Sequence, residues 1–178
     1  MKYRLMPYVY AQAKASSERG LPMLRALFVE YPDDPGSWTV EDEYLFGSDI
    51  LVAPLFEEGA TGRNVYLPPG GWVDYQTGRT YAGGWQRIGA GAVPAVILVR
   101  DGAAIPHAAV APSTDRIDWA RLELVTYVAK APKAHGLVCL PSDNVLREVA
   151  VDAAGKFLPS GDPLAGRVKW TVRRGGRG

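Results

Sequence analysis

Three carboxylates near the start of the chain are the first residues that could do chemistry. Glu30, Asp33 and Asp34 lie at the C-terminal end of a short apolar run between Pro22 and Pro32. If this run is a strand of a (β/α)8 barrel, the carboxylates lie at its carboxyl end, where such barrels place their catalytic groups. We favour the simpler interpretation, in which Asp33 and Asp34 form a turn and cap the next helix. Carboxylates so close in sequence do not by themselves face each other across a bond to be cleaved.

A group of aromatic residues in the middle of the chain is a candidate binding surface. Its members are Trp72, Tyr75, Tyr81 and Trp85. A row of such rings could stack on the faces of sugars, but aromatic residues are also favoured in strands, where they fill the core. We favour the core as the place of these four side chains.

The two histidines and the single cysteine offer little further chemistry. His107 and His135 each lie in a turn flanked by Gly, Ala or Pro, without an obvious partner, so we do not expect either to act as a catalytic acid or base. Cys139 lies in an apolar run, which predicts a buried side chain, and a lone cysteine excludes an intrachain disulfide or a zinc site built on cysteines. The sequence therefore predicts no catalytic residue, no cofactor site and no metal site in this chain.

The composition excludes several classes of protein. Lys and Arg number 20 against 19 Asp and Glu, and this balance argues against a dedicated nucleic-acid-binding protein. The basic end, Arg173–Gly178, could contact phosphates, but a solvated terminus is expected there. No apolar run approaches the roughly 20 residues of a membrane span, and the first ten residues lack the apolar core of a signal peptide. We expect a soluble protein with no membrane partner and favour the cytoplasm, although a missing N-terminal part would carry any targeting signal.

The first 57 residues contain the segments that best fit helices. Apolar residues recur every three or four positions from Tyr3 to Arg19, which predicts a helix that ends at Gly20. Pro7 fits such a helix only in its first turn. The run between Pro22 and Pro32 is expected to be a buried strand, and a second short helix is expected to continue through Leu45.

From Asp49 onward the hydrophobic period is two, which predicts strands. The expected strands are Ile50–Phe56, Asn64–Leu67, Trp72–Tyr75, Arg79–Tyr81, Val96–Val99, Leu122–Val128, Gly136–Leu140, Val145–Val151 and Val168–Val172. Because Pro54 cannot donate to a ladder, the first of them is expected to lie at an edge or to bend. Short strands spaced by about ten residues, with Gly/Pro turns between them, predict a β-sandwich.

Five segments occur in an order that resembles one enzyme family. They are Tyr3–Tyr10, Pro22–Phe28, Phe46–Pro54, Val65–Asp74 and Val99–Pro106. Together they resemble the C-terminal part of family 31 glycoside hydrolases, the α-glucosidase and α-xylosidase group. The resemblance covers about the first 106 residues, and it accounts for Pro7 because the family carries a proline inside the corresponding helix.

The resemblance implies a mainly β fold in which β-sandwich domains follow a helix-strand-helix remnant of a (β/α)8 barrel. Residues 1–57 would be the C-terminal end of the catalytic barrel, residues 58–108 a proximal β-sandwich and residues 109–178 a distal β-domain. Such a barrel takes about 250 residues, which is more than the whole chain of 178. An uncovered barrel remnant would pack on the sandwich in a rearranged way or self-associate.

The function implied by the resemblance is that of a parent enzyme. Family members hydrolyse terminal α-linked sugars with retention, and their two catalytic aspartates lie upstream of the tyrosine-rich helix, so no catalytic residue is carried over. The chain would then be an inactive C-terminal fragment of an enzyme for α-glucosides or α-xylosides, with carbohydrate as the partner of the parent enzyme. The alternative is a stand-alone, non-catalytic β-sandwich module that binds carbohydrate or protein.

Overall fold

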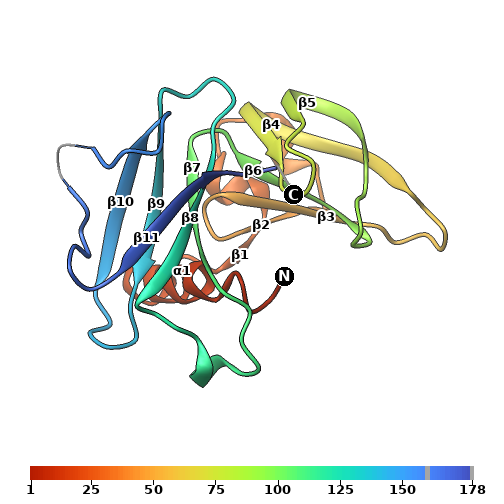
Figure 1. Ribbon diagram of the computed structural model, residues 1–178. Helices are drawn as coiled ribbons and strands as arrows, with labels where there is room; N and C mark the ends of the chain where they lie inside the picture. The colour runs from red at the N-terminus through yellow and green to blue at the C-terminus, as the bar shows by residue number, and fades with distance from the viewer. Residues whose placement is uncertain (159–160, 177–178) are drawn as a thin grey trace. The chain divides into compact units, whose positions relative to one another are not determined.

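Strands dominate the structure, a computed structural model that describes residues 1–158 and 161–176 (Figure 1). The chain divides into two compact units. The five-stranded unit consists of Met1–Leu21 and Gly102–Arg174, and the six-stranded unit is built on Pro22–Asp101. None of the described helices is long and apolar enough to cross a membrane.

The six-stranded unit is one antiparallel sheet with the order β1-β2-β3-β6-β4-β5. Its strands are β1 (Leu24–Arg25), β2 (Tyr44–Phe46), β3 (Ile50–Pro54), β4 (Gly62–Asp74), β5 (Thr80–Gly89) and β6 (Ala95–Arg100). Strand β4 pairs along most of its length with β5 but touches β6 only at Trp72–Asp74. The core includes the fully buried side chains of Leu45, Leu51, Leu67, Trp72 and Leu98.

Two of the predicted elements in this unit are wrong. The expected strand between Pro22 and Pro32 is only the two-residue β1, followed by the short helix α2 (Leu27–Glu30). The Arg25 side chain turns back to the Pro22 carbonyl oxygen and pairs with Glu30 across α2, and these contacts bend the segment. The expected second helix is replaced by a 3-10 helix, η1 (Pro35–Trp38), and by β2.

Strand β4 is longer than the sequence indicated. The Pro-Pro-Gly-Gly stretch from Pro68 to Gly71 was expected to be a turn between two strands, but it is an irregularity inside β4, where the register shifts between Leu67 and Gly71. A bulge of this kind bends a strand without ending it. Likewise β5 runs through Gly83 and Gly84 without turning. Strand β3 is not an edge strand, since β2 and β6 flank it and Pro54 is its last residue.

The five-stranded unit has the sheet order β10-β9-β7-β8-β11. Its strands are β7 (Ala103–Ala108), β8 (Arg121–Tyr127), β9 (Lys133–Cys139), β10 (Leu146–Asp152) and β11 (Lys169–Arg174), with a 3-10 helix, η2 (Thr114–Arg116), after β7. Strand β11 runs parallel to β8, and it includes the first two residues of the segment expected to be a frayed end. Residues 177–178 of that segment lie outside the described residues. The central strand β7, buried at all six positions, was not predicted because its Ala-rich sequence has no alternating pattern.

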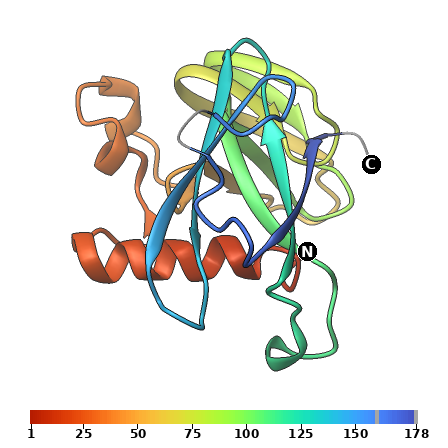
Figure 2. The ribbon, with the colours of Figure 1, turned by 60° about the vertical axis from the view of Figure 1, so that its left-hand side comes forward.

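Helix α1 (Met6–Arg19) belongs to the five-stranded unit and confirms the predicted helix. Pro7 lies in the first turn, where its missing N–H costs nothing. Gly20 ends the helix with a φ of 70°, a left-handed conformation that favours glycine. The helix buries Tyr8, Ala11 and Ala15 and runs across strands of its own sheet (Figure 2), with most of its contacts to β7 and β9.

The units do not follow the expected domain boundaries. Strands β1 to β3, which fall inside the expected barrel segment 1–57, pair antiparallel within the sheet that contains β4 to β6. A barrel strand would pair in parallel with neighbours on both sides. The change from one unit to the other falls between Asp101 and Gly102 rather than at residue 108. The mainly β class is confirmed.

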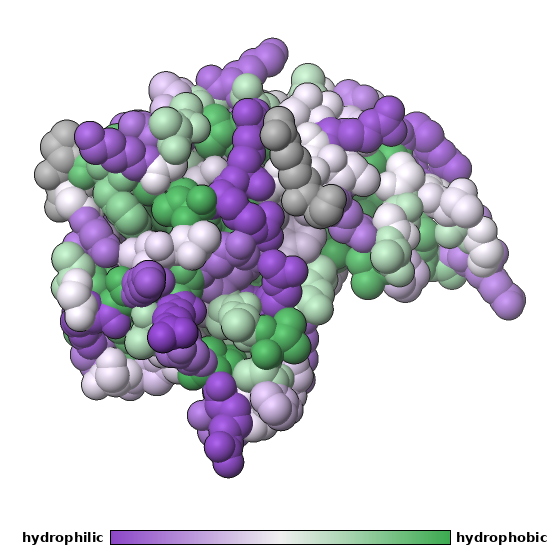
Figure 3. Space-filling model, viewed as in Figure 1, coloured by the Kyte–Doolittle hydropathy of each residue, from purple (hydrophilic) through white to green (hydrophobic). Residues whose placement is uncertain are grey.

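Some large apolar side chains remain exposed in the six-stranded unit. Leu24 and Trp38 are each 59% exposed, and the Trp38 ring stacks on Phe28 with 4.7 Å between the ring centroids. On the face of the molecule shown in Figure 3, hydrophobic residues form groups that are separated by hydrophilic ones.

Candidate functional site

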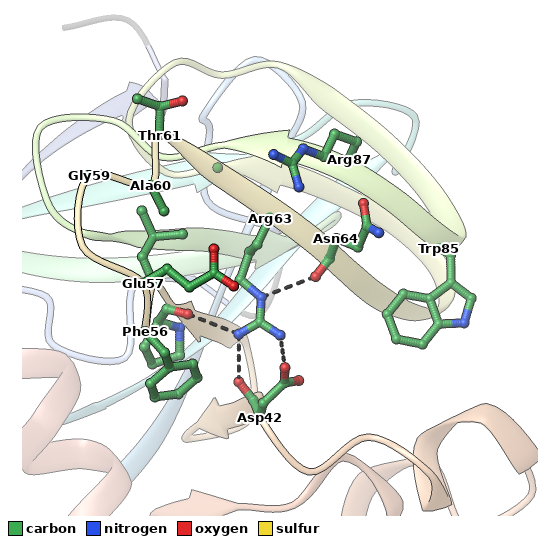
Figure 4. Close-up of a pocket in the computed structure, with 13 residues that line it drawn as sticks. Asp42, Phe56, Glu57, Gly59, Ala60, Thr61, Arg63, Asn64, Trp85 and Arg87 are labelled. Atoms are coloured by element: carbon green, nitrogen blue, oxygen red, sulfur yellow. Dashed lines mark hydrogen bonds and ion pairs between the residues drawn. The ribbon is translucent and has the colours of Figure 1, made fainter.

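A pocket of about 530 Å³ lies on the six-stranded unit, between the β4–β5 ribbon and the loop that joins β3 to β4 (Figure 4). The loop contributes Phe56 and Glu57, and the ribbon contributes Asn64, Trp85 and Arg87. This volume is typical of sites for small molecules, which are about 300–1,000 Å³. We therefore take the pocket as the candidate site.

The pairing of β4 with β5 determines which side chains line the pocket. Asn64 is paired with Arg87 and Tyr66 with Trp85. Because side chains alternate along a strand, these four share one face of the ribbon, while Val65 and Ile88 are buried on the other face. Ile88 is only 1% exposed and Val65 is fully buried.

Arg63 connects the ribbon to the segments beside it. Its Nη1 donates to the carbonyl oxygens of Asp42 (3.1 Å) and Pro54 (2.9 Å), its Nε donates to the carbonyl oxygen of Asn64 (3.1 Å), and its Nη2 forms an ion pair with the Asp42 carboxylate (Figure 4). The Phe56 ring lies 5.7 Å from the guanidinium carbon. With so many partners, Arg63 acts as a structural anchor of the pocket.

Trp85 lies on the pocket wall and is 61% exposed. The Trp85 ring makes a T-shaped contact with the ring of Tyr66, with 5.4 Å between centroids and 60° between the planes. The Tyr66 hydroxyl in turn donates to both carboxylate oxygens of Asp34, at 2.8 and 2.9 Å. Gly36 makes room for the Tyr66 ring, since a Cβ at Gly36 would lie 2.1 Å from the hydroxyl. Trp85 is thus held by a chain of ordered contacts.

The three carboxylates singled out by the sequence do not converge. Asp34 accepts from the Ser37 hydroxyl at 2.7 Å and from the Gly36 N–H at the start of η1, which confirms the predicted turn and cap. Burial acts to raise the pKa of Asp34, but the hydrogen bonds from Ser37 and Tyr66 outweigh it and hold the pKa below its ordinary value. Glu30 pairs with Arg25, and Asp33 is exposed. In the described part of the chain, no group of three or more His, Cys, Asp or Glu residues could hold a metal ion.

The aromatic group divides between core and pocket. Trp72 is fully buried and donates its Nε1–H to the Pro68 carbonyl oxygen at 2.9 Å, and Tyr81 packs against the same core. Tyr75 is half-buried. The expectation of a core role is therefore confirmed for Trp72 and Tyr81 and is wrong for Trp85.

Glu43 lies beside the pocket, next to Asp42, and is only 5% exposed. Its Oε1 accepts from the Tyr66 N–H at 2.8 Å, whereas its buried Oε2 has no hydrogen-bond partner among the described residues. Burial raises the pKa of Glu43 to about 7, and the Tyr66 N–H and the Arg63 guanidinium offset only part of this effect. Sequence reasoning missed Glu43.

The histidines and the cysteine belong to the five-stranded unit. His107 is 2% exposed on β7, with its Nδ1 3.7 Å from Glu123 Oε2. Burial, assisted by Arg4, lowers the pKa of His107 to about 4, so the imidazole is neutral near pH 7. His135 is exposed on β9. Cys139 is buried, as predicted, and burial raises the pKa of its thiol, which disfavours the reactive thiolate.

Comparison with known proteins shows a likeness to one enzyme family. Residues 20–105 match the domain described as "Glycosyl hydrolase family 31 C-terminal domain". Over these residues the chain resembles the C-terminal domain of family 31 glycoside hydrolases. The match begins just after helix α1 and ends within β7, so it includes the whole candidate pocket.

Individual relatives agree with this assignment. The chain is 36% identical over 135 residues to alpha-glucosidase 2 of Bacillus thermoamyloliquefaciens, covering 75% of this chain and 17% of the relative. It is 40% identical over 83 residues to an isomaltosyltransferase of Sporosarcina globispora, covering 47% of this chain and 8% of the relative. The solved structure of the family 31 α-xylosidase of Xanthomonas citri matches 98% of the chain and 21% of its own length, with 28% identity and a TM-score of 0.75. The chain therefore spans less than a quarter of each of these proteins.

Proposed function

We propose that this chain is the C-terminal part of a retaining α-glycoside hydrolase that acts on terminal α-linked glucosides or xylosides. The observation that carries the proposal is the family 31 C-terminal domain at residues 20–105. Two comparisons support the proposal. Nearly the whole chain is similar to the structure of an α-xylosidase, and three quarters of it is similar in sequence to an α-glucosidase. Carbohydrate is then the partner of the parent enzyme.

Within this proposal, the family's catalytic barrel contributes only helix α1 to the chain. The six-stranded unit corresponds to the proximal β-domain and strands β7 to β11 to the distal one. The antiparallel pairing of β3 with β6 supports this narrower assignment over a barrel segment that reaches residue 57.

The chain by itself is expected to be catalytically inactive. Retaining hydrolysis needs two carboxyl groups about 5–5.5 Å apart, one on each side of the glycosidic bond. Asp34 is instead engaged by Ser37 and Tyr66, and Glu30 by Arg25. The purified chain should release no chromophore from aryl α-glucosides or aryl α-xylosides above the blank. Release that disappears in D33N or D34N would show that the chain holds its own catalytic carboxylates.

The genomic sequence upstream of Met1 tests the parent enzyme separately. We expect a segment that encodes the barrel with its two aspartates, in the same or in a shifted reading frame. An upstream region without such a segment would favour the alternative of a stand-alone module that binds carbohydrate without cleaving it. The exposed Trp85 in the pocket is the observation that favours this second function, carbohydrate binding without cleavage.

Self-association through the exposed apolar side chains of the six-stranded unit is also expected. Phe28 and Trp38 form a stacked apolar pair at the surface, and water contact with such a pair is unfavourable. Light scattering after size exclusion should show a mass that rises with concentration, and the double variant F28S/W38S should lower it. V110S, which changes a 73% exposed residue of the other unit, is the control. A monomer at every concentration would contradict the expectation.

A further inference from the structure

We propose that the pocket between the β4–β5 ribbon and the β3–β4 loop is a binding site for a short α-linked gluco-oligosaccharide. The rings of Trp85 and Phe56 would contact the sugar faces, and Asn64 and Arg87 would bind its hydroxyl groups. The site itself is argued from geometry, while the α-glucoside chemistry of its ligand rests on the proposed function.

The two rings are large apolar surfaces that the fold leaves in water. Phe56 is 73% exposed and Trp85 is 61% exposed. One face of a pyranose presents C–H groups, which pack well against an aromatic ring because the face of the ring carries partial negative charge. Burial of part of each ring under a sugar would remove apolar area from water.

Trp85 is ordered before any ligand arrives. Its ring makes a T-shaped contact with the ring of Tyr66, whose hydroxyl is fixed by Asp34. Binding to a preordered ring avoids part of the entropy cost of immobilising a side chain. The chain of contacts from Asp34 through Tyr66 therefore gives the Trp85 ring a defined orientation, while the residue remains 61% exposed.

Asn64 and Arg87 supply hydrogen-bonding groups next to this platform. They are paired across the ribbon, on the same face as Trp85, and both are exposed (Figure 4). Within residues 1–158 and 161–176, neither the Asn64 amide nor the Arg87 guanidinium has a side-chain hydrogen-bond or ion-pair partner. Planar amide and guanidinium groups offer several donors, and the amide also offers an acceptor. Adjacent hydroxyl groups of a sugar, which both donate and accept, match them.

The charges of the pocket favour a neutral ligand. Arg63 is paired with Asp42, and the remaining charged side chains on the lining are Glu57 and Arg87. Apart from the ion pair, the lining therefore has one positive side chain, Arg87, and one negative side chain, Glu57. A site for the phosphates of nucleic acid would need an excess of positive charge, which this lining does not provide.

Titration of the full 178-residue chain tests the proposal. Isomaltotriose and maltotriose are added separately while NMR records the indole N–H signals of the tryptophans. We expect saturable shifts centred on Trp85, with a dissociation constant in the millimolar range. W85A should weaken binding about tenfold or more, equivalent to about 1.4 kcal/mol, and the double variant N64A/R87A should also weaken it. W38A is the matched control, because Trp38 is 59% exposed on the same unit and does not line the pocket.

Two results would overturn the site. One is the absence of saturable shifts with both trisaccharides at millimolar concentration in the wild-type chain. The other is an equal loss of affinity in W38A and W85A, with circular dichroism showing that both variants are folded. Either result leaves the hydrolase proposal intact, since that proposal is tested by the upstream sequence. Conversely, an upstream region without a barrel would leave the titration valid as a test of sugar binding.

Discussion

Replacement of Trp72 by alanine is expected to destabilise the six-stranded unit by about 3–5 kcal/mol, the usual cost of truncating a buried tryptophan or phenylalanine. Trp72 is fully buried in the core, and its Nε1–H is satisfied by the Pro68 carbonyl oxygen at 2.9 Å. Alanine would leave a cavity and would also remove the donor to this carbonyl. W72F should cost less, because it retains most of the apolar volume and loses mainly the hydrogen bond.

Hydrogen exchange in increasing denaturant is the suitable measurement, because it follows each unit separately. Amides of β4 and β6 should lose protection in W72A, whereas those of β7 and β8 report on the other unit. W85A is the matched control: it deletes the same side chain from the exposed face and loses the edge contact with Tyr66, which is worth about 0.5–1.5 kcal/mol. Equal destabilisation by W72A and W85A would contradict the assignment of Trp72 to the core.

The contrast between these two tryptophans shows how far the sequence could predict the site. Both lie in β-favouring segments rich in aromatic residues, and composition alone assigned both to the core. Their burial differs because Trp72 pairs with Tyr81 after the irregularity in β4, whereas Trp85 pairs with Tyr66 before it. The Pro68–Gly71 stretch predicts a turn between two strands, so the sequence alone does not reveal the register that exposes Trp85.

The elements of the fold were predictable where one periodic pattern extended over enough residues. Helix α1 and strand β8 were found for this reason. The short apolar run after Pro22 could not be assigned, because periodicity does not distinguish a buried strand from a buried helix over so few residues. In that run, the Arg25 side chain contacts Glu30 and the Pro22 carbonyl oxygen, and the pattern of apolar residues does not indicate these local contacts.

The remaining parts of the site depend on contacts between residues far apart in the sequence. Arg63 is anchored by Asp42, which lies 21 residues earlier, and Tyr66 by Asp34, which lies 32 residues earlier. Neither pair forms a motif at fixed spacing. The alternation of Asn64 with Val65 and of Arg87 with Ile88 was the available signal for the outward face of the ribbon, and it identifies the polar pocket residues once the strand pairing is known.

The second large effect expected is a pH-dependent stabilisation by Glu43→Gln. Burial raises the pKa of Glu43 to about 7 in the folded chain, above its ordinary value of 4.5. The folded state therefore holds the proton more tightly than the unfolded state, and the stability linked to it is fully present below pH 4.5 and is lost as the pH rises through 7. Each unit of pKa difference between the folded and unfolded states is worth about 1.4 kcal/mol, so the free energy of unfolding falls by about 3 kcal/mol once Glu43 is ionised.

Glutamine cannot ionise, so E43Q should not show this loss. Its side-chain oxygen can still accept from the Tyr66 N–H, as Glu43 Oε1 does. Its amide nitrogen takes the place of the unpartnered Oε2, which adds a cost for a buried donor that does not vary with pH. The informative quantity is therefore the difference in free energy of unfolding between E43Q and wild type as a function of pH, rather than its value at any one pH.

We expect that difference to shift in favour of E43Q by about 2–3 kcal/mol between pH 4.5 and pH 8, with the steepest change between the unfolded and the folded pKa of Glu43. Denaturant unfolding, followed through the amides of β4 at several pH values, measures it. E41Q is the control, because Glu41 is exposed two residues away and its replacement makes the same change in charge. If E41Q and E43Q show the same pH profile, the effect arises from net charge, and the buried carboxyl group beside the pocket is not its source.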